Sequence, residues 1–322
     1  MIELKNVSKK YGDFFAVNNI SFNIDDGEII GLLGPNGAGK SSLMNMITGF
    51  IEATSGEIII DNDNIEKKSK IVKSKIGYMP EGVPLYMELT PFEFVSFMAE
   101  LRGVPKKDRK AAVNKALDAV KVSEVKNQLI KTLSRGYKQR VSMAGTIVGE
   151  PPILIFDEPT VGLDPKQILE IRELIKELGK THTVIFSSHI LSEVSQICKR
   201  VIIINKGEVV AIDTPENLES KMTTTNSVMV ISDPLEDKMD KVKEILIDVD
   251  EISLIEENED GTKQYLITTK KDVDLRKQIF DCFSSVKITI LEMKKIETSL
   301  EEVFIKLISE DKGYTVEEEE KE

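Results

Sequence analysis

Short apolar runs alternate with helical patterns along the chain up to about residue 220. Ile153–Phe156 and Val201–Ile204 are continuous apolar runs of strand length, whereas Met1–Lys10 alternates apolar and polar residues. Continuous runs of this length are typical of buried strands, and alternation is typical of a strand with one exposed face. Dense Gly and Pro residues separate these segments. The order predicts an α/β fold in which strands and helices follow one another.

A helical segment interrupts this order. Thr90 can cap a helix that starts at Pro91, and Glu93 completes a capping box. Gly103 is placed to end this helix, so the pattern predicts a helix over 90–103. One apolar face of this helix holds Phe94, Phe97, Met98 and Leu101, and the inner face of the next helix holds Val113, Ala116, Leu117 and Val120.

The pattern changes near Lys221–Asn226. Beyond it, the predicted order is strand, helix, strand, strand, helix, strand and a last helix. The two middle strands, Glu251–Glu257 and Thr262–Thr268, flank Asp260–Gly261, a dipeptide that favours a hairpin turn. This order is typical of a small ferredoxin-like α/β unit.

Three regions follow from these patterns. We expect a large α/β domain over 1–220 with a helical subdomain at about 86–135. A small accessory α/β domain is expected over 221–311. The glutamate-rich end, 312–322, is expected to be a solvated, disordered tail.

Composition limits the class of protein. Apolar residues make up 41% and charged residues 30% of the chain, as in an ordinary globular protein. No stretch approaches the about 20 consecutive apolar residues that span a bilayer. The net charge of −12 argues against nucleic acid as a partner, because such binding needs a basic surface. Two cysteines and no secretory segment favour a reducing cytosol, with Cys198 and Cys282 as core thiols.

One motif indicates a phosphate-binding loop. A GxxxxGK[ST] sequence follows the apolar strand Glu28–Leu33 and precedes the helix Ser42–Ile47. Its residues are Gly34, Pro35, Asn36, Gly37, Ala38, Gly39, Lys40 and Ser41. The glycines let backbone N–H groups point at phosphate oxygens, and the helix start adds positive potential. Lys40 can reach the β- and γ-phosphates, and the Ser41 hydroxyl can bind Mg²⁺.

Three further residues are candidates for catalysis. Asp157 and Glu158 end the apolar strand Ile153–Phe156, where Asp157 can hold Mg²⁺ and Glu158 can act as general base on water. His189 follows the strand Thr183–Ser188, at the end where α/β sheets present functional groups. His182 is assigned to a loop without a catalytic role.

Six ordered motifs make residues Met1 to about Leu218 resemble the nucleotide-binding domain of the ABC family. The matching segments are Gly34–Ser41 (Walker A), Leu133-Ser134-Arg135-Gly136-Tyr137 (signature), Ile153–Glu158 (Walker B), Gly162-Leu163-Asp164 (D-loop), His189 (switch histidine) and Tyr11 (adenine stacking, with Val17 beside it). The resemblance implies an ABC-type P-loop fold with a mixed central sheet, an antiparallel β subdomain and a helical insert. It also implies that nucleotide contacts extend to Ser42.

The resemblance further implies a head-to-tail dimer with a second ATPase domain, either a second copy or a close paralogue. Each ATP would lie between Walker A of one domain and the signature of the other, where Ser134 and Gly136 hold the γ-phosphate. Asp164 would link the two sites. A separate transmembrane permease would bind the helical insert and the segment Glu81–Met87, which places the chain in the cytoplasm at the inner face of the membrane.

Two departures from the common motifs affect this interpretation. The signature has Arg135 and Tyr137 where glycine and glutamine are commonest, and Glu81 replaces the usual glutamine after Gly77–Pro80. A carboxylate at residue 81 can still bind Mg²⁺, but it adds negative charge beside the phosphates. Both changes resemble the branch that serves ABC-2 type exporters, as does the run Ile296–Phe304.

Two alternatives stay open at this point. One is a soluble ABC ATPase that acts on ribosomes or DNA, although such proteins usually carry two ATPase domains or long coiled coils. The other is a non-hydrolysing ATP-binding regulator, although Lys40, Asp157, Glu158 and His189 are all present. The transported substrate is not encoded here, because its contacts belong to the permease.

Overall fold

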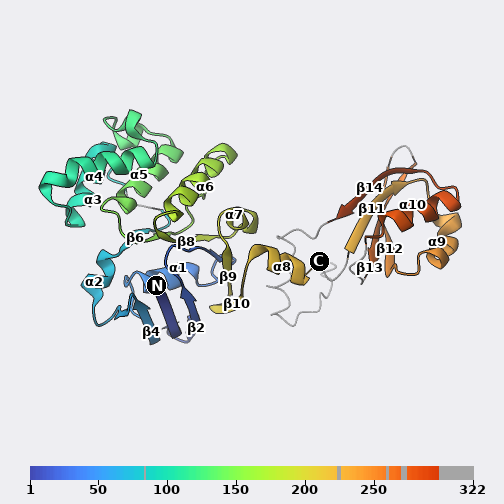
Figure 1. Ribbon diagram of the computed structural model, residues 1–322, viewed down its shortest axis with the longest axis horizontal. Helices are drawn as coiled ribbons and strands as arrows, with labels where there is room; N and C mark the ends of the chain where they lie inside the picture. Colours follow the sequence, from blue (N-terminus) through green and yellow to red (C-terminus); the bar gives the residue numbers. More distant parts are fainter. Residues whose placement is uncertain (83–84, 223–225, 259–260, 270–273, 297–322) are drawn as a thin grey trace, which may run out of the picture. The chain divides into compact units, whose positions relative to one another are not determined.

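The computed structural model describes residues 1–82, 85–222, 226–258, 261–269 and 274–296. The chain divides into two compact units, the first over Met1–Pro215 and the second beginning at Glu216 (Figure 1). The division therefore precedes the Lys221–Asn226 stretch that the pattern indicated, since α8 (Pro215–Met222) starts the second unit. No helix among these described residues is long and apolar enough to cross a membrane.

The centre of the first unit is a six-stranded sheet. All neighbouring strands in it are parallel except the edge pair β10–β9. In order across the sheet the strands are β10 (Glu208–Asp213), β9 (Arg200–Asn205), β3 (Ile29–Leu33), β8 (Thr183–Ser188), β7 (Ile153–Phe156) and β6 (Ile76–Met79). The mixed central sheet is thus confirmed, and the carboxyl ends of β3, β7 and β8 lie at one edge.

A second, antiparallel sheet contributes to the same core. Its strands, in order, are β2 (Phe14–Ile24), β1 (Ile2–Tyr11), β4 (Ser55–Ile60) and β5 (Asp63–Asn64). Apolar residues of β1, β2 and β4 share one buried cluster with the helix α1 (Lys40–Ile47) and with β3 and β9. The helix α1 is therefore held by apolar packing with both sheets, which fixes where it starts. The short helix α2 (Ser69–Ser74) follows this sheet.

The helical insert begins as the pattern predicts. Thr90 Oγ1 accepts a hydrogen bond from the Glu93 amide at 3.2 Å, and the Glu93 carboxylate accepts one from the Thr90 amide at 2.8 Å. Gly103 follows with a φ of +76°. The helices of the insert are α3 (Pro91–Leu101), α4 (Lys106–Ala119) and α5 (Arg135–Ile147), with single turns at η1 (Ser123–Val125) and η2 (Ile130–Thr132).

The apolar face of α3 differs from the predicted one. Phe94 is buried, but Phe97 and Leu101 are 40% and 65% exposed, and Val95 and Ala99 are buried instead. The reason is that α3 packs against both α4 and α5, so the buried stripe is rotated toward Val95 and Ala99. In α4, by contrast, Val113, Ala116 and Leu117 are buried as expected.

The second unit has the predicted ferredoxin-like order. Its described elements after α8 are β11 (Asn226–Ser232), η3 (Glu236–Lys238), α9 (Met239–Ile245), β12 (Glu251–Glu257), β13 (Lys263–Thr269), α10 (Arg276–Ser285) and β14 (Ile290–Ile296). The sheet order is β12-β13-β11-β14, with every pair antiparallel. Apolar residues of α9 and α10 form one core with β11 and β13. The predicted Ile296–Phe304 match, apart from Ile296, and the tail over 312–322 lie outside the described residues.

Candidate nucleotide-binding site

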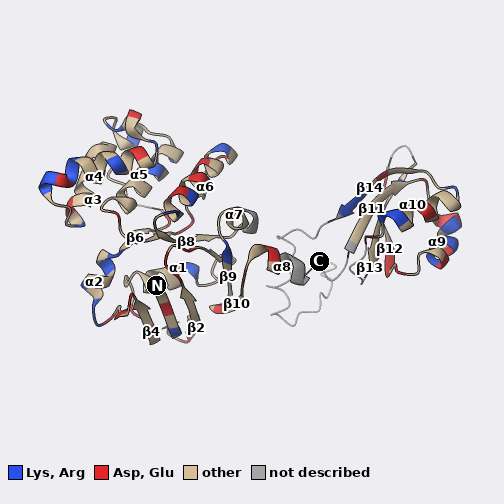
Figure 2. Cartoon of the chain, viewed as in Figure 1, with Lys and Arg blue, Asp and Glu red and all other residues tan. Residues whose placement is uncertain are grey.

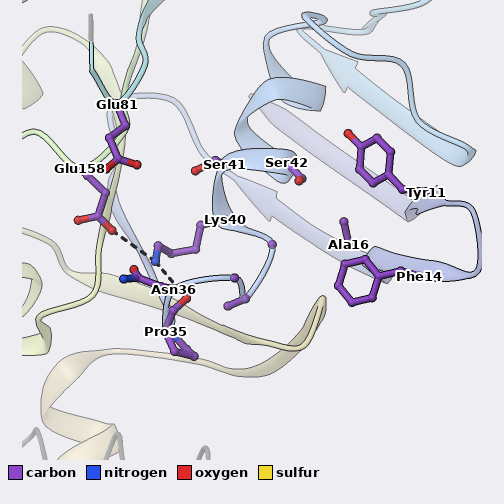
Figure 3. A pocket seen from close by; sticks show the side chains of 13 residues that line it. Tyr11, Phe14, Ala16, Pro35, Asn36, Lys40, Ser41, Ser42, Glu81 and Glu158 are labelled. Carbon is purple, nitrogen blue, oxygen red and sulfur yellow. Dashed lines mark hydrogen bonds and ion pairs between the residues drawn. The ribbon is translucent and has the colours of Figure 1, made fainter.

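A pocket of about 510 Å³ opens beside the loop that joins β3 to α1 (Figure 3). Eight of the predicted nucleotide-binding residues line it in one continuous stretch: Pro35, Asn36, Gly37, Ala38, Gly39, Lys40, Ser41 and Ser42. Tyr11, Glu81 and Glu158 line it as well. Residues far apart in the sequence therefore meet at the carboxyl edge of the central sheet, where open α/β sheets bind ligands.

The loop leaves the start of α1 open toward the pocket. Gly39 precedes the helix with a φ of +105°, and a Cβ atom there would lie 2.2 Å from the Ala16 carbonyl oxygen. Only glycine fits this position. No side chain of the described residues caps α1. The first amide groups of the helix are therefore available to an anion, such as a phosphate group.

Lys40 is the buried cation of the site. Its side chain is 6% exposed, and Nζ donates to the Gly34 carbonyl oxygen at 2.7 Å. Nζ also lies 3.4 Å from the Pro35 carbonyl oxygen and 3.3 Å from Glu158 Oε1. A buried charge needs such partners, because removal from water is costly. Gly34 thus contributes its carbonyl oxygen to the site.

Glu158 connects Lys40 to His189. The Glu158 side chain is 7% exposed, and its Oε2 accepts a hydrogen bond from His189 Nδ1 at 3.0 Å. Its Oε1 is buried and makes no hydrogen bond within the described residues beyond the ion pair with Lys40. This carboxylate oxygen therefore has capacity to accept a proton from a further group, as a general base must.

Asp157 and Glu158 are fixed through Ser187 on β8. The Ser187 hydroxyl donates to Asp157 Oδ1 at 2.6 Å and accepts from the Glu158 amide at 2.8 Å. Glu158 has a φ of +48°, which turns its side chain away from the strand direction of β7. Ser187 therefore fixes the Asp157 carboxylate and the Glu158 backbone, while the Glu158 carboxylate is held by Lys40 and His189.

The predicted metal ligands are oxygen donors. Ser41 and Glu81 line the pocket, whereas Asp157 is only 2% exposed at the end of β7. A hydroxyl and carboxylates fit a hard cation such as Mg²⁺. The described residues hold no cluster of three or more His, Cys, Asp or Glu that could bind a metal alone. Burial and the Asp157 carboxylate raise the pKa of Tyr78, so this neighbour stays a neutral phenol.

Two aromatic rings stand at the other end of the pocket. Tyr11 and Phe14 are cross-strand partners in the β1–β2 hairpin and are 51% and 62% exposed. Both side chains line the pocket, with Ala16 between them (Figure 3). The position predicted for Val17 is wrong, because the alternation of β2 turns Val17 into the core with no exposed surface. Phe14 and Ala16 were missed, although the hairpin spacing from Tyr11 is a signal for Phe14.

The predicted signature and D-loop residues form a separate group. Ser134 caps α5, with Oγ accepting from the Tyr137 amide at 3.4 Å, and Asp164 caps α6 (Pro165–Gly179), with Oδ1 accepting from the Gln167 amide at 2.9 Å. Arg135 and Tyr137 lie in the first turn of α5, and Gly136 there is buried against Gln167. None of these predicted residues lines the pocket of their own chain.

Tyr137 has a contact that the signature motif did not predict. Its hydroxyl donates to the Glu124 carboxylate at 2.7 Å, which raises the pKa of Tyr137 and lowers that of Glu124. The bond ties the first turn of α5 to η1 in the helical insert.

Comparisons with known proteins agree with this geometry. Residues 17–161 match the family model described as ABC transporter. The chain is 39% identical over 223 residues to the linearmycin resistance ATP-binding protein LnrL of Bacillus subtilis, covering 69% of this chain and 72% of the relative. It is 33% identical over 310 residues to the bacitracin transport ATP-binding protein BcrA of Bacillus licheniformis, covering 96% and 97%.

A solved structure gives the same fold. It is a dimeric ATP-binding cassette in a post-hydrolysis state, bound to ADP and Pi. The two structures superpose with a TM-score of 0.60 and 30% sequence identity, and the match covers 66% of this chain and 98% of the other. Together with the relative that matches nearly the whole length, this shows that the chain belongs to the ATP-binding proteins of the ABC transporter family.

Proposed function

We propose that this chain binds and hydrolyses ATP and thereby drives a separate membrane permease, as one subunit of an exporter. The observation that carries the proposal is the chain of contacts Lys40–Glu158–His189 beside an uncapped helix start. Lys40 and Glu158 line the pocket, and His189 contacts Glu158 without lining it. A cation, a general base and a group that orients the base are the parts that phosphoryl transfer to water requires. A non-hydrolysing regulator would not need this set intact.

Lys40 changes partners when the nucleotide binds. The phosphate groups carry more negative charge than the Gly34 and Pro35 carbonyl oxygens, so Lys40 Nζ moves its bonds to them. Glu158 Oε1 then loses its ion pair and is free to accept the proton of the attacking water. His189, which keeps its bond to Oε2, holds the carboxylate in place.

Ser41, Asp157 and Glu81 are the residues that would hold Mg²⁺. When bound, this cation offsets the negative charge on the phosphate oxygens and orients them for attack. Because the described residues offer no complete ligand cluster, phosphate oxygens and water would provide the remaining ligands. Glu81 adds a second carboxylate near the phosphates, which strengthens the need for the cation.

A second ATPase domain would complete the site. Ser134 and Gly136 lie at the start of α5 and do not line the pocket of their own chain. The positive end of the helix dipole at this position favours an anion. The relative bound to ADP and Pi is dimeric, which supports the same arrangement here. Two chains, or this chain and a paralogue, would thus share each ATP, and loss of the γ-phosphate after hydrolysis would release the dimer.

The permease would dock on exposed apolar side chains of the insert and of the segment before it. Tyr86 and Phe97 are 55% and 40% exposed, and their rings meet edge to face at 5.7 Å. Met87 and Leu101 are 44% and 65% exposed nearby in sequence. Val83 lies outside the described residues. Their exposure supports docking rather than a place in the core. A chain docked there would lie at the cytoplasmic face of the membrane.

Export is the direction that the relatives support. LnrL is a linearmycin resistance ATP-binding protein, and BcrA is a bacitracin transport ATP-binding protein. We infer the same direction for this chain without assigning it a substrate.

Light scattering of the Glu158→Gln chain tests the proposal. With ATP the mass is expected to double, because ATP binding persists while hydrolysis stops; without ATP the chain stays a monomer. Glu173→Gln, on the exposed side of α6, is the matched control, which should turn ATP over like the parent and form no lasting dimer. A Glu158→Gln chain that stays monomeric at saturating ATP would overturn the shared-site proposal.

The permease is tested by purification of the tagged full-length chain from native membranes. A multi-helix membrane protein should accompany it. Co-purification with ribosomes or DNA instead would favour the soluble alternative.

A further inference from the structure

The segment that follows Glu158 leaves the central sheet, so its carbonyl groups need partners other than a strand. Within the segment, the Val161 amide donates to the Glu158 carbonyl at 3.3 Å, and the Leu163 amide donates to the Thr160 carbonyl at 3.2 Å. In these turns the Val161 and Leu163 amides have partners, whereas the carbonyl oxygens of Pro159 and Val161 accept hydrogen bonds from outside the segment.

Side chains near the start of α5 donate hydrogen bonds to these two carbonyl oxygens. Arg135 Nη2 donates to the Val161 carbonyl oxygen at 3.0 Å, and Gln139 Nε2 donates to the Pro159 carbonyl oxygen at 2.9 Å. The two donors are four residues apart on α5, one turn of the helix, and therefore lie on one face. The start of the signature helix is thereby bonded to the loop that directly follows the catalytic base.

Gly162 leaves room for the Arg135 side chain. Its φ is +71°, and a Cβ atom there would lie 2.2 Å from Cζ of the Arg135 guanidinium. The guanidinium therefore packs directly on the backbone of the loop. A residue at the Arg135 position without a long donor could make neither this contact nor the bond to Val161.

The other side of the loop is anchored independently. The Thr160 hydroxyl donates to the buried Glu193 carboxylate at 2.7 Å, and Ser188 donates to the same carboxylate at 3.2 Å. The loop then runs into Asp164, which caps α6. Between Thr160 and Asp164, Arg135 contributes a side-chain hydrogen bond, to the Val161 carbonyl oxygen, in addition to the turn within the loop.

We propose that Arg135 is a positioning residue that couples the trans-acting start of α5 to the Glu158–Asp164 loop of its own chain. The inference rests on the proposed function, in which Ser134 and Gly136 contact the nucleotide of the partner domain. A change at the start of α5 on binding that nucleotide is carried through Arg135 to the loop behind Glu158. Arg135 thus links one ATP site to the catalytic base of the other.

Steady-state kinetics of the full-length chain test this. Arg135→Ala is expected to lower kcat about three- to tenfold, the effect of losing one exposed hydrogen bond, and to reduce the Hill coefficient for ATP toward 1. The dissociation constant of ATP for the monomer, measured at a protein concentration below dimerisation, should not change, because Arg135 does not line the pocket. Lys138→Ala removes a cation from the same helix turn, where its Nζ contacts the Lys131 carbonyl, and should retain parental kinetics.

Two further variants separate positioning from folding. Arg135→Lys keeps one donor and should restore part of kcat and of the Hill coefficient. Gly162→Ala pushes a Cβ against the guanidinium, so its effect on kcat should be smaller in the Arg135→Ala background than in the parent. Additive effects of the two substitutions would mean that the contact does not act as a unit.

Hydrogen exchange gives a readout that needs no ATP. Arg135→Ala should speed exchange of the amides of residues 161–163 while β7 stays protected. Unchanged exchange and unchanged kcat would overturn the coupling. A parent chain without ATPase activity would instead contradict the proposed function. In that case, unchanged exchange of residues 161–163 in Arg135→Ala would overturn the positioning role of Arg135, and faster exchange would support it.

Discussion

The two units of the chain bury polar groups in different ways. Within the described residues, all the charged side chains classed as buried belong to the first unit: Lys40, Asp157, Glu158 and Glu193. In the second unit the buried polar residues Ser232 and Thr269 are neutral, and the side chains of the Arg276–Asp274 ion pair are 49% and 50% exposed. Figure 2 shows that both units carry Lys, Arg, Asp and Glu residues. Charge burial is costly and seldom improves stability. Two of these four residues, Lys40 and Glu158, line the nucleotide pocket, which marks that pocket as functional.

The comparison teaches where a substitution should affect turnover and where it should affect only stability. The charged cluster is stabilised by partners that a nucleotide can replace. The core of the second unit, by contrast, combines apolar packing with a few complete hydrogen bonds. Substitutions in the first region should therefore change ATP chemistry, and those in the second should change only unfolding.

The largest effect is expected for Glu158→Gln. The amide cannot accept the proton of the attacking water, so kcat should fall by about 10²- to 10⁴-fold. ATP affinity should change little, since Lys40 and the start of α1 still bind the phosphates. Single-turnover hydrolysis of labelled ATP measures the rate, and parental turnover by this variant would remove Glu158 from the role of base.

Phe14 lines the pocket beside Tyr11, the residue predicted to stack on adenine, and we expect its ring to contact the same base. Phe14→Ala should weaken ATP binding about tenfold, because stacking on a base is worth about 1–3 kcal/mol by alanine substitution. Binding of tripolyphosphate, which has no base, should be unaffected. Equilibrium dialysis measures both. Phe50→Ala removes a ring that is 77% exposed outside the pocket and serves as control; equal losses for ATP and tripolyphosphate would show that Phe14 does not contact the base.

Tyr265→Phe probes the second unit. The buried Tyr265 hydroxyl accepts a hydrogen bond from the Leu235 amide at 2.8 Å. Its loss leaves that amide unpaired and should lower the free energy of unfolding of this unit by about 1–3 kcal/mol, with kcat unchanged. Thermal melts followed by circular dichroism measure the shift, and Tyr86→Phe, with an exposed ring, is the control. A fall in kcat would break the contrast between the units.

The smallest effect is expected for Leu101→Glu. A charge on this exposed apolar position should weaken permease binding about threefold, since it lies at the rim of the proposed docking surface. ATPase activity of the isolated chain should stay the same. Leu169→Glu places the same charge on α6, where Leu169 is 56% exposed. Affinity for the permease in detergent measures the difference, and equal loss for both variants would argue against docking on α3.

The sequence was sufficient for elements whose geometry is local. The capping box at Thr90 and the hairpin between β12 and β13 depend on neighbouring residues, and the structure confirms both. The loop predicted to bind phosphate also depends on neighbouring residues, and the structure places it along a pocket. The ferredoxin-like order followed from the sequence of elements alone. Such features need no knowledge of distant contacts.

Features set by tertiary packing were not predictable. Which face of α3 is buried depends on the angles at which α4 and α5 pack on it, so Phe97 and Leu101 became exposed. Ala16 lines the pocket, whereas its neighbour Val17 faces the core. Adjacent strand residues point to opposite faces, and the sequence pattern does not show which of two apolar neighbours faces the pocket. The bond from Arg135 to Val161 joins segments 26 residues apart, and no pattern encodes it.

The most direct test of the account is calorimetric titration of Mg²⁺–ATP into the parent chain and into the double variant Lys40→Ala/Glu158→Gln. The second substitution is included because Lys40→Ala alone would leave the buried Glu158 carboxylate without its cation. We predict binding by the parent and an affinity at least about tenfold lower for the double variant, while Lys73→Ala, on α2, binds like the parent. Equal affinity of the parent and the double variant would contradict the claim that Lys40 holds the phosphates.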